Sequence, residues 1–399
     1  MNGILELLIE NSTRLITGCE REYRRYFIQH IDFGQKMLGI VGARGVGKTT
    51  AILQHLKTLD LPFAQKLYIS ADMIEIADMG LFEIAKTFER YGGKVLAIDE
   101  IHKRRHFETD LKNIYDRLKL RVIFSGSSAL KLEHSKADLS RRASLYRVQG
   151  LSYREFLELK LARSLPRYGL EEILRNHTDI AASLLDGFKP LEHFGEYLKY
   201  GYYPFYFEER NRYLDKLETT INTVIEVDLP SIFSIKYENV ANLKKLVKLL
   251  CSSDPYTVNI SELSKKTGIS RDRLYLYIDY LGRGAIFLPI PAKSKGDGIF
   301  VKPAKLYLHN ANLYHAYCVQ AKKGTVREAF FANTISLEHE IVHARTGDFL
   351  VDDRYVFEIG GRKKGYKQIK DIADSFVAAD DIEVDFGNKI PLWLFGFLY

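Results

Sequence analysis

The 399-residue sequence predicts an α/β fold, in which a parallel sheet is covered on both faces by helices and is followed by smaller domains. Short β-rich apolar runs alternate with amphipathic stretches from about residue 20 to 150, which is the pattern of parallel sheets. A glycine-rich loop of the form G-x-x-x-x-G-K-[ST], residues 42–49, follows an apolar strand-like run and precedes a helical pattern. The character of the chain changes at Ser152, where helical periodicity begins to dominate. These observations indicate a phosphate-binding α/β core with further domains behind it.

The elements of the predicted sheet follow in order. The expected strands are Met37–Val41, Lys66–Ile69, Val95–Ile98, Arg121–Phe124 and Leu145–Val148. Helical patterns lie between them, for instance at Leu81–Tyr91 and Phe107–Leu118. Strands and helices in alternation predict that each strand is followed by a helix that crosses a face of the sheet.

Beyond the sheet, Ser152 and Glu155 form a capping box, which predicts that a helix begins there. Helical periodicity continues to about residue 250, with a break at 201–204, and residues 255–290 form a compact unit. Strands and helices are mixed again from residue 300 to 399. We therefore expect four domains: a P-loop core at 1–150, a helical lid at 151–238, a winged helix-turn-helix at 239–295 and an α/β domain at 296–399.

The composition is that of a globular protein, with 46% hydrophobic and 27% charged residues. The net charge of +7 fits contact with a polyanion, and a solvated basic face would give the same charge. Cys19, Cys251 and Cys318 are far apart in the sequence and form no C-x-x-C pair, so we expect neither a disulfide framework nor a zinc site. No apolar run approaches the ~20 residues of a membrane span. We expect a cytoplasmic protein with no membrane partner.

The glycine-rich loop has the residues that phosphate binding requires. Its glycines let the backbone turn so that successive N–H groups point at phosphate oxygens, and the helix that follows adds the positive end of its dipole. Lys48 is expected to reach the β- and γ-phosphates, and the Thr49 hydroxyl to bind Mg²⁺. The residues expected to bind the nucleotide are Gly42, Ala43, Arg44, Gly45, Val46, Gly47, Lys48, Thr49 and Thr50.

The strand at 95–98 ends in Asp99 and Glu100, as a Walker B strand does. Asp99 is expected to hold Mg²⁺ beside Thr49, and Glu100 to polarise the attacking water. A buried apolar strand that ends in two carboxylates is otherwise costly unless the carboxylates bind something. A strand that runs into a solvated turn is the alternative.

Three further residues are candidates for catalysis. Ser125 begins the turn of small residues at 125–128, directly after the next strand. A hydroxyl at this position suits a sensor of the γ-phosphate. The alternative is that Ser127 or Ser128 is a helix N-cap, which explains these residues equally well. Arg141 or Arg142 is a candidate arginine finger, and a solvated basic turn is the alternative. The guanine signature N-K-x-D is missing, since residues 388–391 lack the Asp and lie far from the loop, so the expected base is adenine.

These motifs together resemble the prokaryotic AAA-type ATPases whose C-terminal half is a domain of uncharacterised function. The resemblance spans most of the chain and includes residues 21–23, 42–49, 95–100, 125–128, 141–142, 151–156, 201–204 and 228–230. It implies ATP and Mg²⁺ as ligands, with the roles given above for the Walker residues. It implies no cellular role.

Residues 259–267 read as a short helix, Gly268 and Ile269 as a turn, and Ser270 as the cap of a second helix that runs through Leu281. Two helices joined by a short Gly-containing turn form the arrangement that reads DNA. The second helix carries side chains for phosphates or bases: Arg271, Arg273, Tyr275 and Tyr277. Residues 285–290 would form a wing strand. AAA-type proteins also use winged helices as lids or interaction modules, so contact with DNA is one of two readings.

In the C-terminal domain, Glu328, Asp348 and Glu358 resemble the metal-binding carboxylates of the restriction-endonuclease-like fold. Glu328 is expected on a helix at 326–336, Asp348 before a strand at 349–351, and Glu358 at the end of the next strand. The sequence departs from that pattern because the usual Glu-x-Lys is here Glu358-Ile359-Gly360. Either a lysine at 363, 364 or 367 substitutes, or the domain is an inactive version of the fold.

Three hypotheses follow. The first is a Mg²⁺-dependent ATPase of AAA type with output on double-stranded DNA, the second a nucleotide-gated DNA-binding switch with little turnover, and the third a metal-dependent nuclease. A second copy of the chain or another protein is an expected partner of the ATPase.

Overall fold

The computed structural model describes residues 2–126, 139, 141–252, 256, 257, 259–293 and 303–399. The chain divides into two compact units, Met1–Gly150 and Leu151–Tyr399, which are described separately. Within the described residues, no helix combines the length and the apolar character that a membrane crossing needs.

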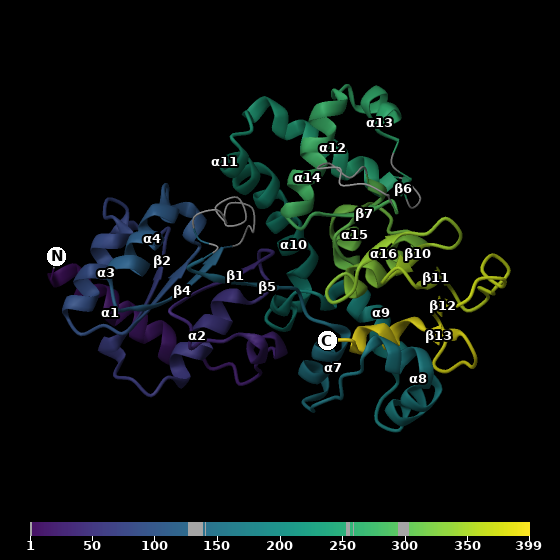
Figure 1. The fold of residues 1–399 in the computed structure, drawn as a ribbon, viewed down its shortest axis with the longest axis horizontal. Helices are drawn as coiled ribbons and strands as arrows, with labels where there is room; N and C mark the ends of the chain where they lie inside the picture. The colour runs from purple at the N-terminus through teal and green to yellow at the C-terminus, as the bar shows by residue number, and fades with distance from the viewer. Residues whose placement is uncertain (1, 127–138, 140, 253–255, 258, 294–302) are drawn as a thin grey trace. The chain divides into compact units, whose positions relative to one another are not determined.

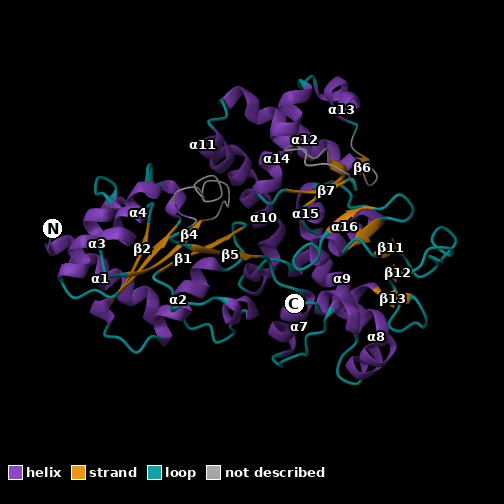
Figure 2. Ribbon diagram, viewed as in Figure 1, coloured by secondary structure: helices purple, strands orange, loops and turns teal. Residues whose placement is uncertain are grey.

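The N-terminal unit is built on a five-stranded parallel sheet in the order β2-β3-β4-β1-β5 (Figures 1 and 2). All five expected strands are present; four are longer than expected by one residue and the strand that starts at Arg121 is longer by two. The strands are β1 Met37–Gly42, β2 Lys66–Ser70, β3 Val95–Asp99, β4 Arg121–Gly126 and β5 Ser144–Val148. The helices are α1 Asn2–Thr17, α2 Lys48–Thr58, α3 Leu81–Arg90 and α4 Phe107–Arg117. The predicted α/β class and its parallel sheet are therefore confirmed.

Alternating side chains bury both faces of this sheet. On one face, Val41, Leu96 and Phe124 belong to a single core that includes residues of α1, α3 and α4. On the other face, strand residues such as Leu38 and Ile123 are also buried. A parallel sheet covered on both faces explains why its strands read as continuous apolar runs in the sequence.

The C-terminal unit begins with a helical region. Its first helix starts after Ser152, and the predicted capping box is present: the Ser152 hydroxyl accepts from the Glu155 N–H at 3.1 Å, and the Ser152 N–H donates to Glu155 Oε2 at 3.2 Å. The predicted break near residue 201 follows a π-helical turn, η5 Tyr197–Gly201. The helices are α7 Tyr153–Leu161, α8 Leu170–Leu185, α9 Pro190–Glu196, α10 Tyr213–Thr223, α11 Leu229–Phe233 and α12 Tyr237–Ser252, with a second π-helical turn η8 Val224–Asp228.

A three-stranded antiparallel sheet follows, in the order β6-β8-β7. The elements are β6 Tyr256–Thr257, α13 Ile260–Thr267, α14 Arg271–Arg283, β7 Phe287–Pro291 and β8 Pro303–Leu308. The two helices that the sequence predicts at this point are present, and the strand expected at 285–290 is found at Phe287–Pro291. The sequence-based division ends this region at residue 295, but β8 pairs with β7 and so extends the sheet beyond that boundary.

A second five-stranded sheet, in the order β13-β12-β11-β10-β9, completes the unit. It is mixed, because β9, β10 and β11 pair antiparallel whereas β11, β12 and β13 pair parallel. Phe331 of α16 packs against Phe349 and Phe357 on one face of it. The elements are α15 Ala311–Tyr317, α16 Lys323–Ile335, β9 Ile341–His343, β10 Phe349–Val351, β11 Tyr355–Gly360, β12 Ser375–Ala379 and β13 Lys389–Pro391.

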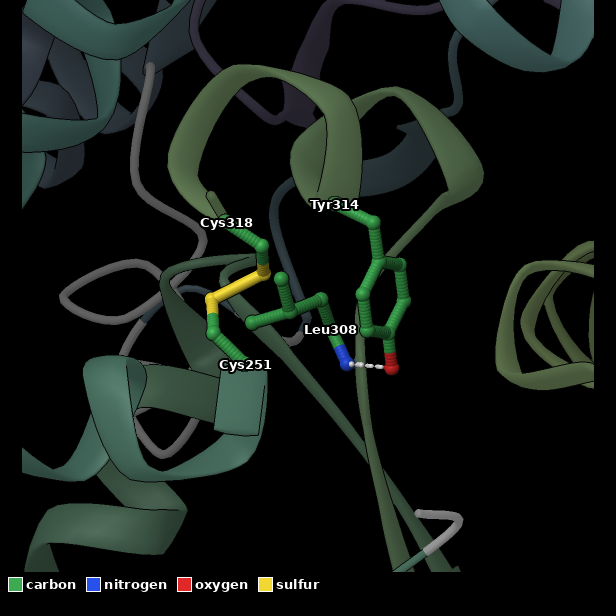
Figure 3. The surroundings of a disulfide bond; sticks show 4 residues. All are labelled: Cys251, Leu308, Tyr314 and Cys318. Atoms are coloured by element: carbon green, nitrogen blue, oxygen red, sulfur yellow. Dashed lines mark hydrogen bonds between the residues drawn. A yellow bond between two sulfur atoms is a disulfide. The ribbon is translucent and has the colours of Figure 1, made fainter. Parts of the chain in front are cut away.

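A disulfide joins Cys251 at the end of α12 to Cys318 just after α15, with the two Cα atoms 5.1 Å apart (Figure 3). Beside it, the Leu308 N–H donates to the Tyr314 hydroxyl at 2.9 Å. The expectation that the cysteines form no disulfide is therefore wrong. The two residues are 67 positions apart in sequence, and only the fold brings them together. Since unpaired cysteines were the reason to expect a reducing compartment, the cytoplasmic location loses that support.

Candidate nucleotide site

The order of the strands brings the predicted nucleotide residues to one edge of the parallel sheet. Strand β4 lies between β1 and β3, and it pairs with both in parallel. The carboxyl ends of these three strands carry the phosphate loop after β1, Asp99 and Glu100 at the end of β3, and Ser125 near the end of β4. Ligands of open α/β sheets bind at this edge. The loop and the carboxylates therefore share one site.

The phosphate loop depends on its glycines at two positions. A Cβ on Gly42 would lie 2.2 Å from the Val148 carbonyl oxygen, so only glycine lets β1 and β5 approach this closely. Gly47 has φ of 95° and precedes the first residue of α2. The Lys48 ammonium then folds back into the loop and donates to the carbonyls of Gly42 at 3.0 Å and Ala43 at 2.8 Å. The lysine expected to bind phosphate is thus buried against the loop itself.

Asp99 is the centre of the site. Its Oδ2 accepts from the Thr49 hydroxyl at 2.5 Å and from the Tyr68 hydroxyl at 2.9 Å. Its Oδ1 accepts from the Ser125 hydroxyl and, at 3.0 Å, from the Glu100 N–H. Asp99 is only 3% exposed, and these four donors are what makes a carboxylate tolerable at that depth. The structure therefore brings Thr49, Asp99 and Ser125 into direct contact.

The donor set fits a magnesium ion bound with nucleotide. Mg²⁺ prefers oxygen ligands and usually binds through one or two protein oxygens together with phosphates and water. The Thr49 hydroxyl and the Asp99 carboxylate supply such oxygens next to the loop. A divalent cation there would neutralise charge on the phosphates of a bound nucleotide.

Glu100 lies directly after the strand, in a left-handed backbone conformation with φ of 51°. Its Oε2 lies 3.4 Å from His102 Nε2, and the imidazole is buried. The carboxylate is partly open to solvent, with 21% of its side chain exposed. Glu100 can thus face a water molecule at the sheet edge while His102 limits its orientation.

The arginine candidates lie in different surroundings. Arg142 makes a two-pronged ion pair with Asp116, with Nε and a terminal nitrogen at 2.9 and 3.0 Å from the two carboxylate oxygens. This guanidinium holds the pKa of Asp116 below its usual value. Arg141 is exposed. Ser127 and Ser128, the other candidate sensors, lie outside the described residues.

Three functional candidates were missed in the sequence. Tyr68 donates to Asp99, and burial followed by the charge of Asp99 raises the pKa of its hydroxyl. His102 contacts Glu100. Arg25 is buried and donates to the carbonyls of Val46, Gln149 and Gly150 at 2.8, 2.8 and 2.7 Å. A tyrosine in an otherwise apolar strand was the available signal for Tyr68, whereas Arg25 has none because its partners are distant in sequence.

The three C-terminal carboxylates that the sequence offers to a metal have lysine partners. Glu328 and Asp348 both contact Lys305, whereas Glu358 forms an ion pair with Lys364. Among the described residues, no group of three His, Cys, Asp or Glu side chains could hold a metal ion. Lys305 thus lies between Glu328 and Asp348, and Glu358 has a separate lysine partner.

Comparisons with known proteins agree with this site. Residues 34–157 match the family model of the AAA domain, and residues 191–323 match a domain of unknown function (DUF8612). The chain is 25% identical to an uncharacterised protein of Methanocaldococcus jannaschii (MJ1637), in an alignment that covers 91% of this chain and 85% of the relative.

Similar solved structures include three proteins at low overall similarity. The Hsp104–ADP complex of S. cerevisiae has a TM-score of 0.29 at 17% identity, covering 69% of this chain and 37% of the Hsp104 chain. AMPPCP-bound DnaA from Aquifex aeolicus has a TM-score of 0.25 at 14% identity, covering 64% of this chain and 85% of DnaA. C. elegans PCH-2 has a TM-score of 0.27 at 14% identity, covering 71% of this chain and 68% of PCH-2. The family match and the sheet with its loop establish that the N-terminal unit has the P-loop NTPase fold and is similar to AAA domains.

Proposed function

We propose that this protein binds ATP with Mg²⁺ in its N-terminal unit and hydrolyses it. The observation that carries the proposal is the 2.5 Å contact between the Thr49 hydroxyl and Asp99, with Glu100 next to it at the same sheet edge. The pair supplies the oxygens for a cation, and the following carboxylate can accept a proton from water. A phosphate loop that only bound nucleotide would not require Glu100 at that point.

In the proposed reaction, the backbone N–H groups of the loop and Lys48 hold the phosphates of ATP. This requires Lys48 to leave the carbonyls of Gly42 and Ala43, to which it donates in the structure. Glu100 accepts a proton from the attacking water, and Ser125 orients the groups around Asp99. Arg141 or Arg142 would stabilise charge on the transferred phosphoryl group, and Arg142 would first have to leave Asp116.

The test is Glu100→Gln, assayed for ATP binding and for phosphate release. The amide keeps the shape and cannot take the proton, so ATP affinity should stay within about threefold while turnover falls roughly 10²–10⁴-fold. Glu75→Gln, an exposed carboxylate in the same unit, is the matched control and should leave both quantities unchanged. Turnover of Glu100→Gln near the wild-type value would remove Glu100 from this role.

A second candidate function is DNA binding gated by nucleotide, with little turnover. The order α12, β6, α13, α14, β7, β8 supports the winged helix expected from the sequence. Arg271 and Arg273 are exposed at the start of α14. Tyr277, which the sequence also offers to DNA, is 5% exposed and belongs to the core of the region instead.

DNA binding is tested by its salt dependence. Double-stranded DNA should bind with an affinity that falls steeply with salt and changes when ATP is added. Arg271→Ala with Arg273→Ala should weaken binding and reduce the salt slope by about 2. Arg175→Ala with Arg345→Ala removes two other exposed arginines of the same unit and should have a smaller effect. Equal losses in the two double variants would indicate non-specific attraction and contradict a role for α14.

A further inference from the structure

A buried lysine lies between two of the three carboxylates that the restriction-endonuclease-like pattern offers to a metal. The Lys305 ammonium, on β8, is 3.2 Å from Glu328 Oε2 on α16 and 3.0 Å from Asp348 Oδ1 before β10. Lys305 is 8% exposed and Glu328 is 9% exposed. The three groups therefore form an ion cluster inside the C-terminal unit, held by three separate elements.

Two further donors contact the carboxylates of this cluster. The Tyr307 hydroxyl donates to Glu328 Oε2, the same oxygen that Lys305 contacts, and the Ile359 N–H donates to Asp348 Oδ2 at 2.8 Å. Burial by itself lowers the pKa of Lys305, but the charges of Glu328 and Asp348 outweigh burial and raise it. The lysine is therefore charged at neutral pH and acts as the counter-ion of the pair.

The third carboxylate, Glu358, lies on the face of the sheet that is turned away from α16. Phe357 packs against Phe331 of α16, whereas Val356, on the opposite face, joins a core with Ile369. Glu358 shares the face of Val356, since side chains alternate along a strand.

Lys364 explains the missing lysine of the Glu-x-Lys pattern. Its ammonium pairs with Glu358, and its aliphatic chain lies over Gly360, where a Cβ would come within 2.6 Å of it. The side chain of Lys364, four positions further along the chain, thus takes the space that a side chain at position 360 would have occupied.

We propose that the Lys305 ammonium is the resident cation of the Glu328–Asp348 pair, so that these carboxylates bind no divalent metal and the domain does not cut DNA. Mg²⁺ would need to lie about 2.0–2.1 Å from carboxylate oxygens that the ammonium already contacts. The cluster instead ties β8 of the three-stranded sheet to α16 and to the loop before β10. This inference is independent of the ATPase proposal, because it concerns a different site.

The experiment is a Mn²⁺ titration of the full chain without nucleotide, with bound metal counted per chain. Wild type and Asp348→Asn should bind the same number of Mn²⁺ ions. Lys305→Met removes the ammonium and keeps an unbranched apolar side chain one atom shorter, so this variant should bind one additional Mn²⁺ that is lost again in Lys305→Met with Asp348→Asn. Lys363→Met, an exposed lysine outside the cluster, is the control and should match wild type.

Two results would overturn the proposal. One is a wild-type Mn²⁺ site that disappears in Asp348→Asn or Glu328→Gln, or wild-type cutting of plasmid DNA with Mn²⁺ that depends on Asp348. The other is a folded Lys305→Met that gains no metal, since the carboxylates would then be an ordinary ion pair. If Lys305→Met does not fold, the Mn²⁺ counts of wild type and Asp348→Asn still test the proposal, because both proteins keep Lys305. Equal counts support it, and a lower count in Asp348→Asn contradicts it.

Discussion

At the scale of single residues, the nucleotide site is organised by hydroxyl groups around one buried carboxylate. Thr49, Tyr68 and Ser125 come from three different elements and all donate to Asp99. These hydroxyls provide the stabilisation that a buried charge requires. The position of the Asp99 carboxylate is thus set by side chains of the protein itself.

Tyr68→Phe tests this account. Loss of one donor to a buried carboxylate should lower the stability of the nucleotide-free protein by about 1–2 kcal/mol. The measurement is thermal unfolding in the absence of ATP. Tyr146→Phe is the matched control. The Tyr146 hydroxyl also takes part in hydrogen bonds, which it accepts from the Asp32 N–H and Gln35, but Tyr146 is only half-buried, where water can replace them. Similar losses of stability in the two variants would mean that the hydrogen bond to the buried Asp99 stabilises the protein no more than a half-buried hydrogen bond does.

At the scale of elements, local sequence signals set where helices begin. The capping box at Ser152 is read from four residues and is present with both of its hydrogen bonds. Ser270 occupies the equivalent position before α14, but in the described structure its side chain makes no capping hydrogen bond. The same residue type at the same position therefore contributes differently, depending on the backbone around it.

Ser152→Ala and Ser270→Ala form a direct comparison. The first should lower stability by about 1–2 kcal/mol, because a buried cap and its reciprocal bond to Glu155 are lost. The second should cost a few tenths of a kcal/mol at most. Urea unfolding measures both, and a larger loss for Ser270→Ala would contradict the assignment of the cap.

At the scale of the whole molecule, the disulfide closes a long loop of the chain between Cys251 and Cys318, which are 67 positions apart. The chain between Cys251 and Cys318 contains α13, α14, all three strands of the β6-β8-β7 sheet and α15. A cross-link over such a loop stabilises mainly by limiting the unfolded chain. Both sulfurs belong to half-buried residues, so a dithiol reductant should reach them.

Reduction should therefore destabilise the C-terminal unit. The chain-entropy model gives about 4 kcal/mol for a loop of this length, or a fall in Tm on the order of 10 °C for a unit of this size. Unfolding with and without dithiothreitol measures the effect, and Cys251→Ser with Cys318→Ser should reproduce it. Cys19→Ser should not change the response, because Cys19 is a free thiol. If reductant does not change the Tm of the wild-type protein, the disulfide contributes little to its stability.

The sequence by itself determined the parts of this protein that depend on neighbours along the chain. Strand and helix positions in the N-terminal unit, the phosphate loop after β1 and the cap at Ser152 follow from periodicity and short motifs, because their physical causes act over a few residues. Even the meeting of Thr49 with Asp99 could be predicted, since parallel strands end at one edge.

Only the tertiary structure decided which distant residues meet. The pairing of Cys251 with Cys318, the three carbonyls around Arg25 and the lysine between Glu328 and Asp348 join positions 21 to 125 residues apart. Such contacts are set by the packing of whole elements, which no local pattern encodes. The carboxylates of the C-terminal domain are the clearest case, because residue types alone suggested a metal where the fold supplies an ammonium.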